Sequence, residues 1–365
     1  MACPALLRRT RDAGRRRAEA DGMSCGTGSR PGSSPRVRAR PKFLETLPPP
    51  PQALPTFAQE IAPPDLSPWL TDHCGIPGVV HHEATRPGPH VVLTALVHGN
   101  EFAGAIVLDR LLREQVRPAC GRLSLIFANL EAFARFTPDN PVASRFIEED
   151  MNRVWNRQIL SSPRHSVELD RARAILPVIE TADILMDLHS MLWPGAPLIL
   201  AGATESGRRL STMIGDPPLV VSDHGHQAGP RLIDYERFSD PASPYAACLL
   251  EAGAHWAAHT VETTDSAVRA LLRHCGLLPA DTAPPAAICR HLVVTDIVTA
   301  QTPCFRFVRP FEGGEVIRRR GTLLAQDGPD EIRTPYPDCM LVMPNLRPSR
   351  GQTAVRLAQT VPIRP

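Results

Sequence analysis

The alternation of strand-like and helix-like segments between residues 91 and 188 constrains this chain most. Val91–Val97 is an apolar, β-branched run that predicts a buried strand, and Phe102–Gln115 has apolar residues at helical spacing. Leu123–Ala128, Val167–Thr181 and Ala182–Leu188 continue the series as strand, helix and strand. This alternation predicts an α/β fold, in which helices flank a sheet and the functional site lies at the carboxyl ends of the strands.

The pattern changes near the C-terminus. A helix is expected at about Asp265–Leu278, and Pro279–Pro285 is typical of a connector. Short β-like runs separated by glycines and prolines then follow at His291–Val298, Cys304–Val308, Glu315–Arg318, Thr322–Ala325 and Cys339–Val342. We therefore expect a small β-rich domain over residues 286–365, after a catalytic domain over residues 51–285.

Residues 1–50 form a leader rich in arginine, glycine and proline. Such a segment cannot bury enough apolar surface to offset its ordering entropy, so we expect it to be disordered. Met23 is an alternative start, which would place residues 1–22 outside the protein.

Composition excludes some partner classes and favours one compartment. The 40 basic and 38 acidic side chains give a net charge of only +2, so charge makes no general case for nucleic acid or anionic membranes. The apolar runs are shorter than the ~20 residues that span a bilayer. Nine cysteines without a C-x-x-C pair favour a reducing, cytoplasmic location.

Metal-ligand types follow two of the predicted strands. The sequence H-G-N-E places His98 and Glu101 after the first strand, and His189 ends the third. A catalytic zinc site needs three such ligands and an open position for water, and the glycine is expected to permit a sharp turn between strand and helix. Asp187 lies two residues before His189, so both side chains share a face and the carboxylate could orient the imidazole. A carboxylate bonded to loop amides is the alternative for Asp187.

Two further charged positions suggest catalytic roles. Arg145 opens a charged stretch, and an arginine beside a metal can bind a carboxylate or stabilise an oxyanion. A solvated charged loop is the alternative. Glu251 follows an apolar strand-like run and precedes a glycine turn, which suggests a general base, with helix capping as the alternative.

The ordered motifs H-G-N-E, R-x-x-x-x-D-x-N-R, D-L-H and E-x-G resemble the succinylglutamate desuccinylase/aspartoacylase family, which is related to zinc carboxypeptidases. The resemblance runs from about Val91 to Asn345. It implies a mixed sheet flanked by helices with a β-rich C-terminal domain, and one Zn²⁺ per chain. The implied roles are zinc ligation by His98, Glu101 and His189, proton transfer by Glu251, carbonyl polarisation by Arg145, and carboxylate binding by Asn152 and Arg153.

One part of the family pattern does not align with this sequence. Family members that act on acidic N-acyl amino acids use a further arginine and a tyrosine for a second carboxylate. Candidates here are Arg231, Tyr235, Arg237, Tyr245 and Tyr336. His255 is another candidate pocket residue, with ordinary packing as its alternative. We interpret His81-His82-Glu83 and His224-Gly225-His226 as solvated loop histidines, because neither ends a convincing strand.

These features predict a zinc-dependent amidohydrolase, a deacylase that cleaves the amide bond of a small N-acylated amino acid. The first alternative is a zinc carboxypeptidase acting on peptide C-termini. The second is a metal-binding homologue without catalysis. The expected partner is a small acylated substrate, rather than nucleic acid or membrane. The acyl group, the amino acid and the oligomeric state, including a homo-oligomer, stay open.

Overall fold

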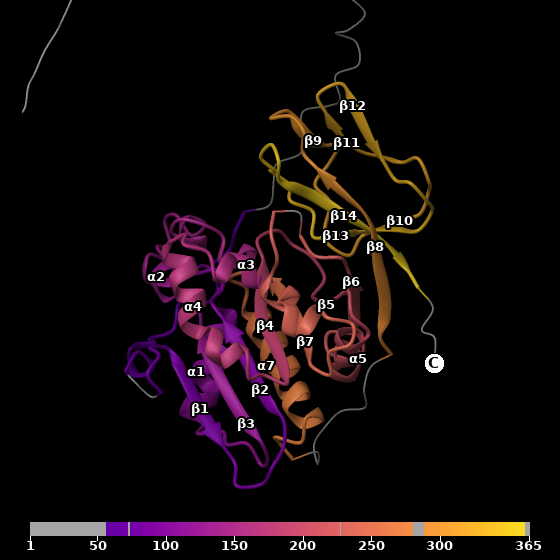
Figure 1. The fold of residues 1–365 in the computed structure, drawn as a ribbon. Coiled ribbons are helices and arrows are strands. Elements are labelled where there is room, and N and C mark those ends of the chain that lie inside the picture. The colour runs from indigo at the N-terminus through magenta and orange to yellow at the C-terminus, as the bar shows by residue number, and fades with distance from the viewer. Residues whose placement is uncertain (1–55, 72–73, 227, 280–287, 362–365) are drawn as a thin grey trace, which may run out of the picture. The chain divides into compact units, whose positions relative to one another are not determined.

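A mixed sheet of 11 strands organises the computed structural model, which describes residues 56–71, 74–226, 228–279 and 288–361 (Figure 1). Its order is β1-β3-β2-β4-β7-β5-β6-β8-β14-β13-β10. The strands are β1 (Val79–Glu83), β2 (His90–Ala95), β3 (Arg122–Phe127), β4 (Ile184–Met191), β5 (Leu198–Gly202), β6 (Leu219–Ser222), β7 (Ala246–Ala254), β8 (Arg290–Thr299), β10 (Val316–Ile317), β13 (Cys339–Val342) and β14 (Thr353–Thr360). A second sheet holds β9 (Phe305–Phe307), β11 (Leu323–Asp327) and β12 (Asp330–Arg333).

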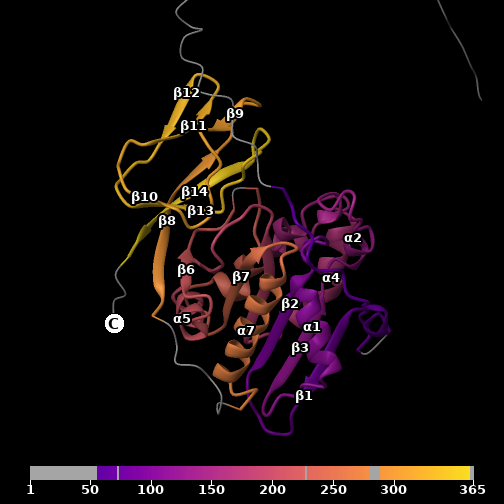
Figure 2. The same ribbon diagram turned by 180° about the vertical axis from the view of Figure 1, so that it is seen from behind.

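Helices cover both faces of the large sheet (Figures 1 and 2). They are α1 (Ala103–Arg113), α2 (Leu130–Ala134), α3 (Arg157–Leu160), α4 (Val167–Ile179), α5 (Glu205–Ile214), α6 (Glu236–Ser239) and α7 (Ala258–His274). Apolar residues of α1, α5 and α7 share one buried cluster with β2, β3 and β7. Those of α4 share the other cluster with β4, β6 and β8. Burial on both faces explains why the central strands are apolar throughout.

The α/β class and the mixed sheet are confirmed, as are the predicted strands β2, β3 and β4 and the helices α1 and α4. The regular elements described within residues 288–361 are all strands, and β8 and β14 pair within the large sheet. The boundary placed after residue 285, the leader over 1–50 and the alternative start at Met23 lie outside the described residues.

Two predictions about local structure were wrong. Helix α7 begins at Ala258, seven residues before the predicted Asp265, although its first turns hold β-branched residues. The Glu60 carboxylate accepts a hydrogen bond from the Ala258 backbone N–H at 2.9 Å, so a distant residue caps this helix. The segment His81-His82-Glu83 is no solvated loop either, because it lies in β1 and pairs with β3.

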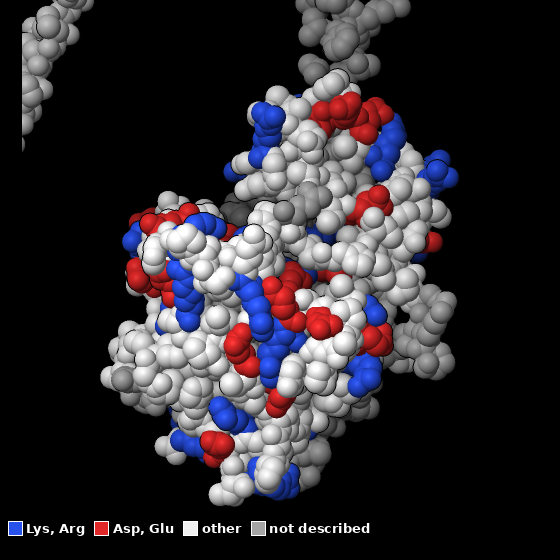
Figure 3. Space-filling view, viewed as in Figure 1, with Lys and Arg blue, Asp and Glu red and all other residues white. Residues whose placement is uncertain are grey.

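On the face shown in Figure 3, arginine and acidic side chains are interspersed rather than gathered by sign. No helix within the described residues is long and apolar enough to cross a membrane. No disulfide joins the seven cysteines in the described part of the chain.

A buried network ties β1, β2 and β3 together at the end of the sheet where β2 begins. His90 Nδ1 donates to the Thr181 carbonyl at 3.0 Å, so His90 Nε2 accepts from the Ser124 hydroxyl at 2.6 Å. His81 Nδ1 then donates to the same hydroxyl oxygen at 2.7 Å. Burial lowers the pKa of both His81 and His90, so the network holds two neutral imidazoles.

We predict that Ser124→Ala lowers the free energy of unfolding by about 1–3 kcal/mol, because it leaves buried imidazole nitrogens without partners. Urea unfolding at pH 7.5 measures this loss. Thr263→Ala on α7, at a partly exposed position, is the control, with an expected change within about 0.5 kcal/mol.

The same network makes the stability of the folded protein depend on pH. The folded-state pKa values of His81 and His90 lie below the unfolded value of about 6.5, so the unfolded chain binds more protons. Wild-type stability should therefore fall as the pH drops below about 6.5. A rise in the stability of the wild-type protein on acidification would contradict the assignment of two neutral imidazoles. Equal losses of stability in Ser124→Ala and Thr263→Ala would contradict the stabilising role of the Ser124 network.

Candidate active site

The loop after β2 positions the first two candidate ligands, and Gly99 is essential to it. A Cβ on Gly99 would lie 2.4 Å from the Phe133 backbone nitrogen and 2.6 Å from the Ser144 carbonyl. The Gly99 N–H also donates to the Arg145 carbonyl at 3.1 Å. Gly99 lies in the expected turn, which the Glu101 N–H closes by donating to the His98 carbonyl at 3.1 Å. Its φ is not positive, so what the glycine provides there is room for the close approach. The loop is thereby fixed against the segment that carries Arg145.

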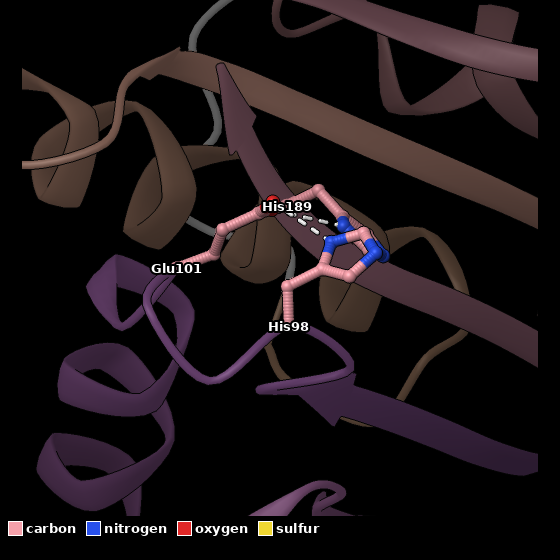
Figure 4. A group of neighbouring side chains, drawn as sticks. All are labelled: His98, Glu101 and His189. Carbon is pink, nitrogen blue, oxygen red and sulfur yellow. Dashed lines mark hydrogen bonds and ion pairs between the residues drawn. The ribbon is translucent and has the colours of Figure 1, made fainter. Parts of the chain in front are cut away.

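His98, Glu101 and His189 converge on one point (Figure 4). The Glu101 carboxylate lies between the two imidazoles, with Oε1 2.8 Å from His98 Nδ1 and Oε2 3.0 Å from His189 Nδ1. All three side chains are buried, and the candidate ligand atoms lie within 4.8 Å of one another. This donor set could hold a metal ion.

The far nitrogens of both imidazoles face carboxylates. His98 Nε2 lies 3.0 Å from Asp150 Oδ1, and His189 Nε2 lies 2.7 Å from Asp187 Oδ2. Asp187 in turn accepts from the Thr94 hydroxyl at 2.7 Å. The carboxylate on His189 Nε2 keeps the proton there and leaves Nδ1 free to coordinate a cation, whereas His98 Nε2 faces both Asp150 and the donor Arg145 Nη2. Sequence reasoning gave Asp150 no role, although it occupies the aspartate position of R-x-x-x-x-D-x-N-R.

Two observations test whether a cation fits this donor set. His98 Nδ1 is buried and makes no hydrogen bond among the described residues, although Glu101 Oε1 lies only 2.8 Å away, so the two atoms are close without being bonded to each other. Although burial opposes protonation, Asp187 and Glu101 raise the pKa of His189 well above its usual value. Burial alone would raise the pKa of the Glu101 carboxyl, but the charges of His98 and His189 hold it well below its usual value. A field that favours a proton on His189 also favours a divalent cation at the same atoms.

Glu251 lies beside the ligands on the neighbouring strand. It pairs with His189 across the parallel strands β4 and β7. Its Oε2 is buried without a hydrogen-bond partner in the described part of the chain. Burial, reinforced by the charge of Glu101, raises the pKa of Glu251 to about 8. A carboxyl group with such a pKa can take up and release a proton near neutral pH.

Arg145 bridges the ligands and Asp150. Its Nη1 donates to Glu101 Oε1 at 2.9 Å, and its Nη2 lies 2.9 Å from His98 Nε2. Although burial opposes it, Glu101, Asp150 and Glu251 raise the pKa of Arg145. The side chain is still 36% exposed, so this permanent cation borders the site while remaining accessible to a ligand.

Asn152 and Arg153 follow in a short 3-10 turn, Met151–Arg153. The Asn152 side-chain carbonyl accepts from the Leu232 N–H at 2.8 Å and so anchors a second loop to this turn. Burial lowers the pKa of Arg153 to about 10, and three neighbouring arginines, Arg145, Arg231 and Arg356, act in the same direction. Arg153 therefore lies in a region of positive potential.

The structure places the two tentative site residues differently. His255 is buried beside the ligands, with Nδ1 2.8 Å from the Ser190 hydroxyl and Nε2 4.0 Å from Glu101 Oε1. Tyr336 belongs to the C-terminal domain, where its hydroxyl lies 2.5 Å from Thr295 Oγ1. No contact described for Tyr336 joins it to the ligand cluster.

The other residues considered for binding a second substrate carboxylate already interact with groups of the protein itself. Arg231 donates to Asp223 and Asp234. The Tyr235 hydroxyl donates to Glu180, and Arg237 donates to the Ala182 carbonyl while stacking on the ring of Tyr245 at 3.5 Å. Glu180 and Ala182 precede β4, whereas His189 lies near its other end, so these tyrosines and Arg237 are remote from the ligands.

His226 was wrongly interpreted as a solvated loop histidine. It is only partly exposed, and burial together with Arg153, Arg356 and Arg231 lowers its pKa to about 3. Its Nδ1 accepts from the Ala228 N–H at 3.1 Å, so Nε2 carries the proton of the neutral ring. The sequence offers no local signal for this position, because the arginines come from three separate segments.

Comparison with known proteins bears on this site directly. Residues 87–192 match the model of the succinylglutamate desuccinylase/aspartoacylase catalytic domain. A succinylglutamate desuccinylase from Pseudomonas fluorescens is 37% identical over 133 residues, which cover 34% of this chain and 37% of that protein. This segment of the chain is therefore similar to the catalytic domain of that family. The sequence matches thus span only about a third of the curated relatives, and the matched domain ends before Glu251.

Solved structures extend the likeness of the fold. The succinylglutamate desuccinylase of Vibrio cholerae has a TM-score of 0.63 at 17% identity, covering 78% of this chain and 86% of that one. A product-bound ectoine utilization protein from Ruegeria pomeroyi has a TM-score of 0.56 at 18% identity, covering 77% and 88%. Both likenesses therefore include strands beyond the matched catalytic domain.

Proposed function

We propose that this protein is a zinc-dependent amidohydrolase that removes the acyl group from a small N-acylated amino acid. The observation that carries the proposal is the convergence of His98, Glu101 and His189, with Glu251 on the adjacent strand. The match of residues 87–192 to the family's catalytic domain supports the same class of reaction.

His98 Nδ1, Glu101 and His189 Nδ1 would hold one zinc per chain. Borderline-soft nitrogen donors with a single carboxylate suit zinc better than the harder Mg²⁺ or Ca²⁺, which prefer oxygen ligands. Zinc bound there would polarise the scissile carbonyl and activate a water molecule. Asp150 and Asp187 would hold the two imidazoles in the tautomer that ligation requires.

Glu251 is the proposed proton carrier. Its buried carboxylate would accept a proton from the attacking water and return it to the leaving amine. A raised pKa suits both halves of this transfer, because the group then exchanges protons without a large energetic penalty. With Glu251 outside the ligand set, three protein ligands leave one position open for water.

The arginines would handle negative charge. Arg145 is placed to stabilise the oxyanion that develops on the scissile carbonyl, because it borders the ligand cluster and keeps its charge. Asn152 and Arg153 would bind the substrate carboxylate next to the amide.

The alternatives are less well supported. Two loops of the C-terminal region contact the segment after β4, through a bridge between Gly195 and Gly313 and a 3.1 Å hydrogen bond from Trp193 to Asn345. Because β4 carries His189, these contacts favour small substrates over peptide chains. The combination of Glu251 and Arg145 favours catalysis over metal binding alone, since metal binding needs neither.

A substrate panel tests the reaction class. We predict that zinc-loaded protein hydrolyses N-acetyl or N-succinyl amino acids with higher kcat/KM than short peptides with a free C-terminus. Release of the free amino acid measures the rate. Preference for the peptides would support the carboxypeptidase alternative, and no hydrolysis of either class would support the homologue without catalysis.

The ligand set is tested separately by metal analysis. We predict about one zinc per wild-type chain and a large loss of zinc in His189→Ala, because two remaining ligands hold the ion weakly. His165→Ala is the matched control, since this histidine is exposed and should not affect zinc content. Full zinc occupancy in His189→Ala would rule out the assignment.

A further inference from the structure

Arg356 on β14 is a buried arginine with little to neutralise it. It is 7% exposed, and its Nε has no hydrogen-bond partner among the described residues. Its closest ion-pair contact is Asp223 Oδ2, at 3.9 Å from Nε. Buried guanidinium groups are normally paired and hydrogen-bonded, because an unpaired buried charge is costly. This arrangement therefore needs an explanation.

Asp223 does not provide that pairing, because Arg231 already occupies both of its oxygens. Arg231 Nη1 donates to Asp223 Oδ2 at 3.0 Å, and Nη2 donates to Oδ1 at 2.6 Å. This bidentate pair is the stronger interaction, and the 3.9 Å contact with Arg356 is weak beside it. Arg356 thus remains a cation whose hydrogen-bonding capacity is largely unused.

The surroundings carry excess positive charge. Four arginines, Arg145, Arg153, Arg231 and Arg356, share this region with three aspartates, Asp150, Asp223 and Asp234. The potential lowers the pKa of His226 to about 3 and that of Arg153 to about 10, with burial as the first cause in both cases. Glu251 and the ligand Glu101 add negative charge, which a bound divalent cation would offset. The region is suited to an anion.

This region adjoins the proposed catalytic groups. The charge of Arg356 lowers the pKa of Glu251 and so opposes the effect of burial. The loop that carries Asp223 and His226 packs on Arg153, since a Cβ on Gly229 would lie 2.4 Å from the Arg153 carbonyl. It is also anchored on Asn152 through the Leu232 N–H. Through its contact with Asp223, Arg356 therefore reaches this loop from β14, which pairs with β8 (Figure 1).

We propose that Arg356 binds a carboxylate of the substrate remote from the scissile amide, so that the C-terminal strands select the anionic substrate. This inference rests on the proposed function, because it takes the ligand to be the substrate of that reaction. The binding site itself is argued from the contacts of Arg356, Asp223 and Arg231. The neutral His226 could donate its Nε2 proton to the same carboxylate. The arginine for this group then comes from β14 and not from the positions just before Glu251, where Arg231 and Arg237 are engaged.

Binding to metal-free protein tests the proposal without any turnover. Calorimetry would compare N-acetyl-L-glutamate with N-acetyl-L-glutamine, which differ in one charge, and N-succinyl-L-alanine with N-butyryl-L-alanine. The first pair places the remote carboxylate on the amino acid, and the second places it on the acyl group. Wild-type protein should bind the charged member of one pair roughly 10- to 100-fold more tightly. Arg356→Met should abolish that preference, and Arg356→Lys should keep part of it.

Stability separates recognition from a structural role. Because Arg356 lacks a good partner, Arg356→Met should leave the melting temperature unchanged or raise it. The exposed Arg290→Met on β8 is the control and should keep both stability and charge preference. A marked fall in melting temperature in Arg356→Met would mark Arg356 as a structural partner of Asp223 and overturn the proposal.

The outcomes for Arg356 and for the reaction are distinguishable. No charge preference in wild-type protein, including no measurable binding, overturns the role of Arg356. A preference that persists in Arg356→Met does the same. A charge preference that Arg356→Met abolishes, in a protein that hydrolyses none of the four compounds when loaded with zinc, would sustain the binding site while contradicting the proposed reaction.

Discussion

The buried carboxylate of Glu101 is the interaction on which the rest of the site depends. A buried carboxylate is costly unless charged or hydrogen-bonded partners surround it. Both imidazoles, the Arg145 guanidinium and the Ser190 N–H converge on its two oxygens. Several local requirements follow from this arrangement. Gly99 must lack a Cβ so that the loop can approach, and the Trp256 indole donates to the Asn100 carbonyl at 3.0 Å to fix the other side.

Three buried polar atoms of the site and of the neighbouring β14 have no hydrogen-bond partner among the described residues. These atoms are His98 Nδ1, Glu251 Oε2 and Arg356 Nε. Each such atom costs stability in the free protein, and natural folds tolerate few of them. Under the proposed function, these atoms would meet a metal ion, a water molecule and a substrate anion, respectively. The fold thus gives up stability where ligand binding can restore it.

The sequence predicted those parts of the fold and site that depend on local patterns. The ends of β2 and β4 supply His98 and His189, and the two-residue period of a strand puts Asp187 on the same face as His189. The structure indeed places Asp187 against His189 Nε2. The role of Asp150 could not be predicted from spacing alone, because its contact with His98 depends on how the Gly99 loop packs against the segment carrying Arg145.

Arg356 shows where sequence reasoning fails. It interrupts the apolar run of β14, which was not predicted as a strand, and its burial follows only from pairing with β8 and β13. The start of α7 failed for a similar reason, since Glu60 caps it from a distant segment. In both cases a tertiary contact overrides local propensity, and such contacts leave no periodic signal.

The central claim is that Glu251 carries the proton while His98, Glu101 and His189 alone hold the metal. Zinc content and turnover of Glu251→Gln, measured on the same preparation, test it most directly. The substitution keeps the shape of the side chain but removes its ability to accept a proton. The account predicts wild-type zinc content and a kcat lower by about 10²–10⁴, with a much smaller change in KM. Loss of zinc would make Glu251 a ligand, and unchanged turnover would place the base elsewhere; either result would contradict the account.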